Sequence, residues 1–213
     1  MIGIRLLTIW AVILALNSAP LEANDAMRLR YTRTDCGDGK TITGHGSCFA
    51  ISEHDILTAA HNVLPEYDKN GQPCGEPFAT LQVEVGGKWV AAKFVRSCNR
   101  IDIAWLHCDE KLEWIEIAKQ DAPVGTLGIV HGRQRDGPLS MYYAKVTSRF
   151  FEGWTRDVAA VPFDHALSGA CFMKDKLCLG MMVAGVPKSG DIDNTRGLFL
   201  PASMLRWFID GGE

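Results

Sequence analysis

The sequence predicts an all-β protein built as a sandwich or as a pair of barrels, and three observations lead to this fold class. Short apolar or alternating runs recur along most of the chain, and Gly, Pro, Asn and Asp signals separate them. No amphipathic helical pattern of about ten or more residues appears before the C-terminal end. The chain has 213 residues, 47% of them hydrophobic and 22% charged, which fits one large or two small globular domains.

The expected strands follow one another with short turns between them. In chain order they cover residues 47–51, 56–60, 81–85, 89–94, 101–106, 125–131, 142–150, 157–161, 171–173, 177–181 and 197–200. Gly86-Gly87 offers the turn of a hairpin between two of these strands. Pro201 then opens a short C-terminal helix over residues 202–209, since proline suits the first turn of a helix.

A stretch richer in charge divides the strands into two groups. We therefore expect an N-terminal β-unit over residues 24–110, a linker over residues 111–122, and a C-terminal β-unit with the terminal helix over residues 123–213. Residues 101–106 are nearly all apolar, which favours a strand buried on both faces. Asp102 interrupts this run, and a buried carboxylate needs a hydrogen-bond donor.

The N-terminus has the layout of a secretory signal over residues 1–23. A short start carrying Arg5 precedes an apolar run over residues 6–16, and small residues follow up to Ala23. The apolar run is shorter than the ~20 residues that cross a bilayer. We expect cleavage after Ala23, which makes the protein secreted or periplasmic, with no stable membrane association afterwards. An uncleaved membrane anchor is the alternative.

Charge and cysteine usage narrow the partners and cofactors. The net charge of −3, without a long Lys/Arg run, argues against nucleic acid as a partner. The seven cysteines include no C-x-x-C pair and no spaced set with histidine, so we expect no metal and no other cofactor. In an exported protein cysteines tend to pair, and an odd number leaves at least one outside an internal disulfide. A bridge between Cys171 and Cys178 is one option, and the connectivity stays open.

Three residues in the order His61, Asp102, Ser168 suggest nucleophilic catalysis. His61 ends Thr-Ala-Ala-His after an apolar run, Asp102 begins Asp-Ile-Ala-Trp-Leu, and Ser168 precedes Gly-Ala. A serine hydroxyl needs an adjacent base to become a nucleophile, and histidine is the usual one. The histidine in turn needs a carboxylate that fixes its tautomer. Taken singly, each residue has a plainer interpretation: a structural histidine, a solvated aspartate at a strand end, and a Ser-Gly turn.

Together the local settings of these residues resemble the chymotrypsin-like (trypsin-like) serine peptidases. The matching segments are residues 46–49, 56–61, 102–106, 168–170 and 180–185. The resemblance implies two antiparallel six-stranded β-barrels with a short C-terminal helix, and a triad of His61, Asp102 and Ser168 in the cleft between the barrels. It also implies an oxyanion hole from the backbone N–H groups of Ala166 and Ser168.

The same resemblance implies that Val183, Ala184 and Gly185 form a strand that pairs with the extended backbone of a protein or peptide substrate. The family usually has glycine two residues before the serine, whereas this chain has Ala166. A Cβ there strains a backbone that needs a positive φ. We therefore predict a secreted serine endopeptidase that works through an acyl-enzyme, with a non-catalytic peptide- or protein-binding homologue on the same scaffold as the alternative.

Overall fold

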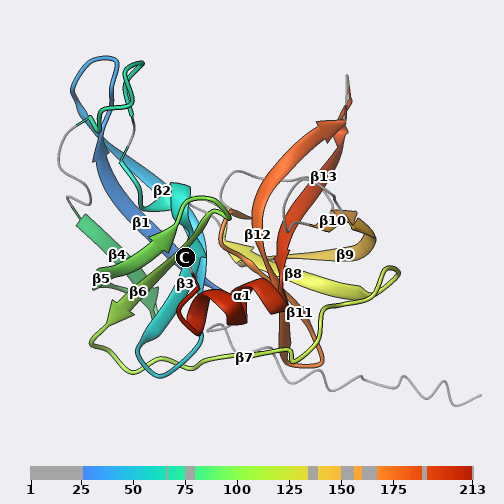
Figure 1. Cartoon of the computed structure of the whole chain (residues 1–213). Helices are drawn as coiled ribbons and strands as arrows, with labels where there is room; N and C mark the ends of the chain where they lie inside the picture. The colour runs from blue at the N-terminus through green and yellow to red at the C-terminus, as the bar shows by residue number, and fades with distance from the viewer. Residues whose placement is uncertain are drawn as a thin grey trace, which may run out of the picture.

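The computed structural model describes residues 26–65, 67–74, 80–133, 139–149, 156–159, 167–188 and 191–212. The predicted signal, residues 1–23, lies outside these ranges, and so does Ala166. Two β-rich halves stand side by side, and the C-terminal helix lies across the base between them (Figure 1). In the part of the chain that is described, no helix has the length and apolar character needed to cross a membrane.

The first half is a closed barrel of six strands in the order β1-β2-β3-β6-β5-β4. Its strands are β1 (Met27–Thr34), β2 (Thr41–Ala50), β3 (Asp55–Ala59), β4 (Thr80–Val85), β5 (Lys88–Cys98) and β6 (Ile103–Cys108). The Gly86-Gly87 turn is confirmed: it joins β4 to β5, and both glycines have positive φ, 56° and 79°. Since left-handed φ values strain residues with a Cβ, glycine suits both positions.

Strand β1 was not among the predicted strands. Its inward positions Met27 and Leu29 are buried, whereas Arg28 and Arg30, which alternate with them, are only half-buried. On the outer face these two arginines stack over the Trp89 ring, with their guanidinium carbons 5.3 and 4.4 Å from its centroid. The alternation of period two is therefore present in the sequence, with arginines at the outward positions.

The second half is a seven-stranded sheet in the order β11-β8-β9-β10-β13-β12-β7, with an additional pairing between β11 and β12. Its strands are β7 (Glu116–Ile117), β8 (Leu127–Arg133), β9 (Leu139–Arg149), β10 (Arg156–Ala159), β11 (Cys171–Lys174), β12 (Leu177–Lys188) and β13 (Asp191–Pro201). The prediction of two six-stranded barrels is thus confirmed for the first half only. β7, from the expected linker, adds to β12 as a short parallel strand, so this half has seven strands and not the six predicted.

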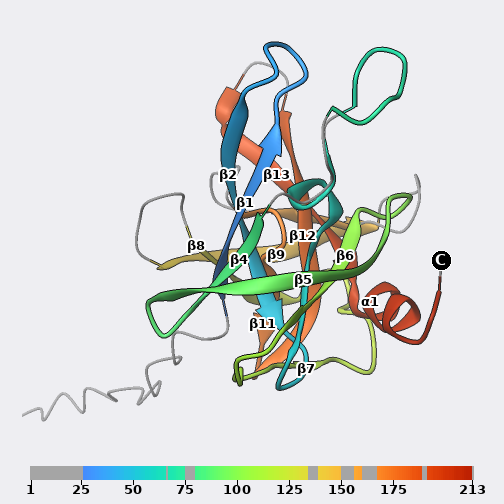
Figure 2. The ribbon, with the colours of Figure 1, turned by 90° about the vertical axis from the view of Figure 1, so that its left-hand side faces the viewer.

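An apolar core fills the space between the halves and fastens the terminal helix. Phe49 and Leu57 of the first barrel share it with Met181 of the sheet and Phe208 of α1 (Ala202–Ile209), and all four are fully buried. The helix occupies the range predicted for it. Figure 2, turned by 90°, shows α1 beside the ends of β5 and β6.

Side chains from both halves hold α1 by its ends. The Asp121 carboxylate accepts hydrogen bonds from the backbone N–H and the hydroxyl of Ser203, at 2.8 and 2.9 Å, in the first turn. At the other end the Arg96 guanidinium of β5 donates to the Phe208 carbonyl and stacks over the Phe208 ring. Carbonyls at a helix C-terminus lack partners within the helix, so an arginine from the first barrel satisfies one of them.

One disulfide is present, between Cys36 and Cys74. Within the described residues, five further cysteines form no disulfide and are buried: Cys48, Cys98, Cys108, Cys171 and Cys178. The suggested bridge between Cys171 and Cys178 is wrong, because a register shift in the hairpin sets Cys171 opposite Met181 and Cys178 opposite Met173. The two thiols are therefore not cross-strand neighbours.

Candidate active site

His61 lies in a short 3-10 helix, Ala60–Asn62, directly after β3. Strand β3 pairs with β6, and Ala59 lies opposite Ile103, so the turn before β6 comes next to the start of this helix. The backbone N–H of Ala60 donates to the Asp102 carbonyl at 3.1 Å. The pairing of β3 with β6 thus brings His61 next to Asp102, which is 41 positions away in the chain.

Asp102 holds His61 through both of its carboxylate oxygens. Oδ1 accepts the His61 backbone N–H at 2.9 Å, and Oδ2 contacts ring Nδ1 at 2.7 Å. Because a carboxylate only accepts, Nδ1 carries the ring hydrogen of neutral His61, and the lone pair remains on Nε2. This is the tautomer that a general base needs.

The position of Asp102 differs from the prediction in one respect. It lies in the turn before β6, which begins at Ile103, and not inside a buried strand. Its φ of 58° is left-handed, a conformation that aspartate tolerates better than most residues. The carboxylate is 33% exposed and the His61 side chain 48% exposed, so the pair lies at the surface, where a substrate can reach it.

Ser168 lies at the boundary between the two halves, in the turn that leads into β11. Its carbonyl accepts two hydrogen bonds from the first barrel, both at 2.9 Å: one from the Ser47 backbone N–H and one from the side-chain amide of Asn62. Asn62 directly follows His61. The segment carrying the candidate base is therefore tied to the candidate nucleophile.

The residues around the Ser168 carbonyl pack closely together. Gly169 has a φ of 89°, and a Cβ at that position would overlap the Ser47 carbonyl oxygen. The Thr58 hydroxyl donates to that same oxygen at 2.8 Å and accepts from Asn62 at 3.1 Å. The sequence patterns pointed to Ser168 and Gly169 and included Thr58 in the Thr-Ala-Ala-His segment, but they gave Thr58 no role and did not point to Asn62. The signal in the sequence was that Thr58 and Asn62 are polar residues in the mostly apolar segment over residues 56–63.

The predicted contact between Ser168 and His61 is not formed in the described residues, and the predicted oxyanion hole lies partly outside them. Ser168 is 4% exposed, and among the described residues no hydrogen bond joins its hydroxyl to the His61 ring. Catalytic hydrogen bonds are often formed fully only when substrate is bound. Ala166, the other predicted member of the oxyanion hole, lies outside the described residues.

The predicted substrate-binding residues lie on β12. There Ala184 and Gly185 pair with Leu198 and Gly197 of β13, and a register shift occurs between Met182 and Ala184. Val183, at the shift, is buried. Within the described ranges no strand pairs with the opposite edge of residues 183–185. This edge leaves backbone groups available to an added strand.

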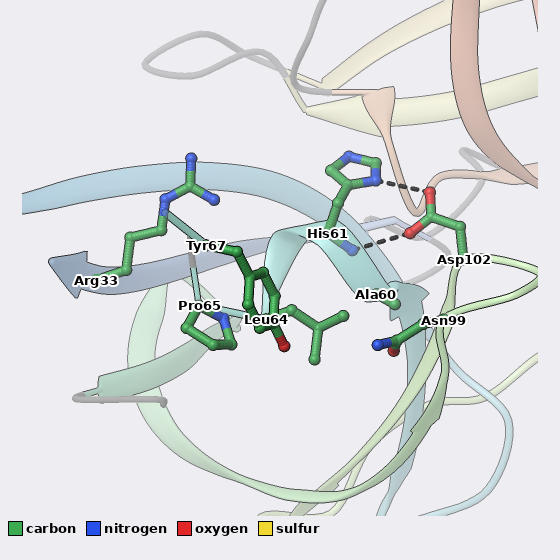
Figure 3. Close-up of a pocket in the computed structure, with 8 residues that line it drawn as sticks. All are labelled: Arg33, Ala60, His61, Leu64, Pro65, Tyr67, Asn99 and Asp102. Atoms are coloured by element: carbon green, nitrogen blue, oxygen red, sulfur yellow. Dashed lines mark hydrogen bonds and ion pairs between the residues drawn. The ribbon is translucent and has the colours of Figure 1, made fainter. Parts of the chain in front are cut away.

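A pocket of about 290 Å³ opens beside the His61–Asp102 pair (Figure 3). Its wall is lined by Arg33, Ala60, His61, Leu64, Pro65, Tyr67, Asn99 and Asp102. Half of these residues are hydrophobic, namely Ala60, Leu64, Pro65 and Tyr67. The volume is at the lower end for ligand pockets, so the pocket suits one side chain better than a whole ligand. No group of three or more His, Cys, Asp or Glu within the described ranges could hold a metal ion.

Comparison with solved structures finds a similar fold in a known protease. The active form of the Rv3671c protease from M. tuberculosis superposes with a TM-score of 0.68, covering 90% of this chain and 82% of that chain at 17% identity. The chain has a chymotrypsin-like fold. The inactive form of the same protease gives a TM-score of 0.67 over 89% of this chain and 90% of that chain, again at 17% identity.

An inactive serine-to-alanine mutant of that protease gives a TM-score of 0.65, covering 88% of this chain and 87% of that chain at 17% identity. No protein-family model matches the sequence, and no curated protein sequence matches it either. The fold is therefore shared, while the assignment of residues to catalytic roles depends on the geometry of this chain.

Proposed function

We propose that this chain is an exported serine endopeptidase. The observation that carries the proposal is the connection from Asp102 through His61 and Asn62 to Ser168, in which hydrogen bonds fix both the histidine tautomer and the main chain of the serine. The chymotrypsin-like fold of the solved protease supports the same activity. The Cys36–Cys74 disulfide is compatible with an oxidising compartment such as the periplasm or the extracellular medium.

In this proposal Ser168 Oγ attacks the carbonyl carbon of the scissile peptide bond, and its proton passes to Nε2 of His61. Asp102 stabilises the imidazolium that forms, while the N–H groups of Ser168 and Ala166 donate to the oxyanion. His61 then gives the proton to the leaving amine as the carbon–nitrogen bond breaks. A water molecule hydrolyses the acyl-enzyme by the same proton route and restores the serine.

Substrate binding uses two features beside the catalytic residues. The free edge of residues 183–185 on β12 takes the extended substrate backbone as an added strand, through Val183, Ala184 and Gly185. The pocket next to His61 takes one substrate side chain. Since its wall includes Leu64, Pro65 and Tyr67, that side chain is apolar.

Pre-steady-state hydrolysis of an activated ester tests the proposal. The protein is mixed with an excess of a nitrophenyl ester, and the release of nitrophenolate is followed in a stopped-flow instrument. A burst equal to the enzyme concentration, followed by slower turnover, is expected, because acylation of Ser168 precedes hydrolysis. The burst must vanish in Ser168→Ala. A burst that survives in Ser168→Ala would assign the nucleophile elsewhere.

The second candidate function is binding of peptides without cleavage. It is favoured by the burial of Ser168, by the missing hydrogen bond between its hydroxyl and His61 in the described structure, and by Ala166 in place of glycine. Under this alternative the protein binds peptides but gives no burst with any ester. If Ala166→Gly then produced a burst, the oxyanion hole would be identified as the defective part.

A further inference from the structure

The loop over residues 67–74 is closed on itself by its own hydrogen bonds. The Asp68 carboxylate accepts the backbone N–H groups of Asn70 and Gln72, both at 2.8 Å, and the Asp68 N–H donates to the Gln72 carbonyl at 2.8 Å. Tyr67 and Pro73 form an isolated β-bridge across its base. These bonds hold the pKa of Asp68 below its usual value, which keeps the carboxylate ionised. The loop is thus a preformed unit that carries Tyr67.

The Cys36–Cys74 disulfide connects this loop to the turn between β1 and β2. The two Cα atoms are 5.2 Å apart, and the residues are separated by 38 positions in the chain. The turn is itself closed by a hydrogen bond from the Asp35 N–H to the Lys40 carbonyl at 2.8 Å. Figure 2 shows this turn and the loop rising side by side above the barrel. The disulfide therefore joins two structured units.

Both units supply walls of the pocket beside His61. Arg33 comes from the end of β1, close to Cys36, and Tyr67 comes from the closed loop (Figure 3). Tyr67 is 51% exposed and lines the pocket, so it is accessible to a group that enters. The disulfide bonds the loop that carries Tyr67 to the β1–β2 turn. It therefore restrains the position of Tyr67 relative to Arg33, which lines the same pocket.

We propose that Tyr67 is a specificity-determining residue for an apolar substrate side chain, and that the Cys36–Cys74 disulfide holds it in place, so that peptide selection depends on the redox state of this bond. The inference rests on the proposed peptidase function and deepens it. An aromatic side chain fixed in position loses little conformational freedom on binding, which favours contact with a leucine-like group.

The redox step involves this disulfide and a dithiol reductant. The dithiol transfers two electrons and two protons to the sulfur–sulfur bond, leaving Cys36 and Cys74 as thiols and the reductant as its cyclic disulfide. Cys36 is exposed and Cys74 half-buried, so the reagent reaches the bond. The five cysteines of the described residues that form no disulfide are buried, so their thiols are poorly accessible to the reagent.

Loss of the disulfide leaves the catalytic pair in place. His61 is held by Asp102, and Asn62 is held by Thr58 and Ser168; all these hydrogen bonds lie outside the loop. The chemistry on a small ester, which does not fill the pocket, is therefore independent of the loop. Loss of the disulfide affects the hydrolysis only of substrates that place a side chain in the pocket.

The test uses a set of peptides in which leucine is replaced by glycine at one position at a time around the cleaved bond. For the native oxidised protein we expect one position at which leucine lowers KM by about tenfold relative to glycine, as burial of a leucine side chain in a partly open pocket allows. Tyr67→Ala, dithiothreitol treatment and the double variant Cys36→Ser/Cys74→Ser should each abolish this preference. Tyr67→Phe should retain it.

Hydrolysis of a small activated ester is measured in parallel and should change less than twofold on reduction of the native protein and in Cys36→Ser/Cys74→Ser. Reduction of Tyr67→Ala should have no further effect, since the ring on which the disulfide acts is already gone. Preference for leucine that survives both Tyr67→Ala and reduction would overturn the inference. A similar loss of activity towards the leucine peptides, the glycine peptides and the ester would also overturn the inference, because it would indicate general destabilisation of the protein.

Failure of the proposed function is recognised separately. If neither ester nor peptide is cleaved, binding of the same leucine and glycine peptides is measured by fluorescence anisotropy. A leucine preference in Kd that disappears on reduction and in Tyr67→Ala supports the role of Tyr67 even in a non-catalytic protein. Equal Kd values for leucine and glycine peptides in the oxidised native chain would overturn it.

Discussion

The side-chain amide of Asn62 donates a hydrogen bond of 2.9 Å to the carbonyl of Ser168, across 106 positions of sequence. Asn62 is 2% exposed, so this bond is shielded from water. It joins the residue after the candidate base to the candidate nucleophile and thereby links the two halves of the fold. The relative placement of His61 and Ser168 then depends on this contact and on the bond from Ser47 to the same carbonyl, as well as on the apolar core.

Removal of this contact should lower catalysis more than stability. For Asn62→Ala we expect a fall in kcat of about 10- to 100-fold with little change in KM, because small displacements of reacting groups have such effects. The Ser168 carbonyl keeps its bond from Ser47, so the loss of stability should be about 1 kcal/mol. Gln82→Ala, which removes a side-chain amide on the far outer face of the barrel, is the control and should leave kcat unchanged. An unchanged kcat in Asn62→Ala would contradict the role of the contact.

Replacement of His61 should abolish turnover. His107 provides a matched control, because its Nδ1 also lies near a carboxylate oxygen, that of Asp55 at 3.4 Å, on another part of the barrel. We expect His61→Ala to reduce kcat/KM by roughly 10⁴-fold or more, and His107→Ala to leave it near the native value. Asp102→Asn should lose about 10⁴-fold through the wrong histidine tautomer. Equal activities of the two histidine variants would exclude His61 as the base.

Gly169 should tolerate no larger residue. In Gly169→Ala the new Cβ meets the Ser47 carbonyl, in addition to the strain of a φ of 89°. Gly71 has a φ of 76° with open space around it, so Gly71→Ala measures the conformational strain alone. That strain costs roughly 1–2 kcal/mol. Thermal unfolding should show a clearly larger fall in Tm for Gly169→Ala than for Gly71→Ala; similar falls would show that the contact with Ser47 yields without cost.

His131 should make stability depend on pH between about 5 and 7.5. It is 1% exposed, and within the described structure neither ring nitrogen has a hydrogen-bond partner. Burial lowers the pKa of His131, since the charged form loses hydration. The unfolded chain therefore takes up a proton near pH 6.5 while the folded chain resists it, so stability falls as the pH drops below that value.

The measurement compares Tm at pH 7.5 and pH 5.0 for the native chain and His131→Leu. We expect the fall in Tm to be smaller in the variant, because the group that resists protonation is gone. The ionised carboxylates with lowered pKa, such as Asp55, titrate below this range and do not obscure the comparison. Identical falls in the two proteins would show that burial of His131 does not contribute.

Local patterns in the sequence predicted much of the fold. The terminal helix begins after Pro201 as expected, and the Gly86-Gly87 hairpin forms where two glycines permit a tight turn. The pairing of His61 with Asp102 was predicted from the need of a carboxylate for a donor, although the carboxylate lies in a turn and not in a strand. Such features depend on neighbouring residues or on a single chemical requirement.

Features that depend on how distant strands pack were not predictable. The contact of Asn62 with Ser168 requires the closing of the first barrel against the second sheet. The pairing of Cys36 with Cys74 requires two turns to meet above the barrel, and spacing along the chain does not reveal this. The pocket beside His61 combines residues from three segments and has no local pattern of its own.

Covalent labelling tests the assignment of Ser168 as nucleophile most directly. The folded protein is incubated with a fluorophosphonate, and intact-mass analysis is followed by peptide mapping. We predict one adduct per chain, located on Ser168, that is absent from Ser168→Ala, from His61→Ala and from protein unfolded by heat before labelling. Folded native protein that remains unlabelled, or that carries the adduct on another residue, would contradict the proposed triad.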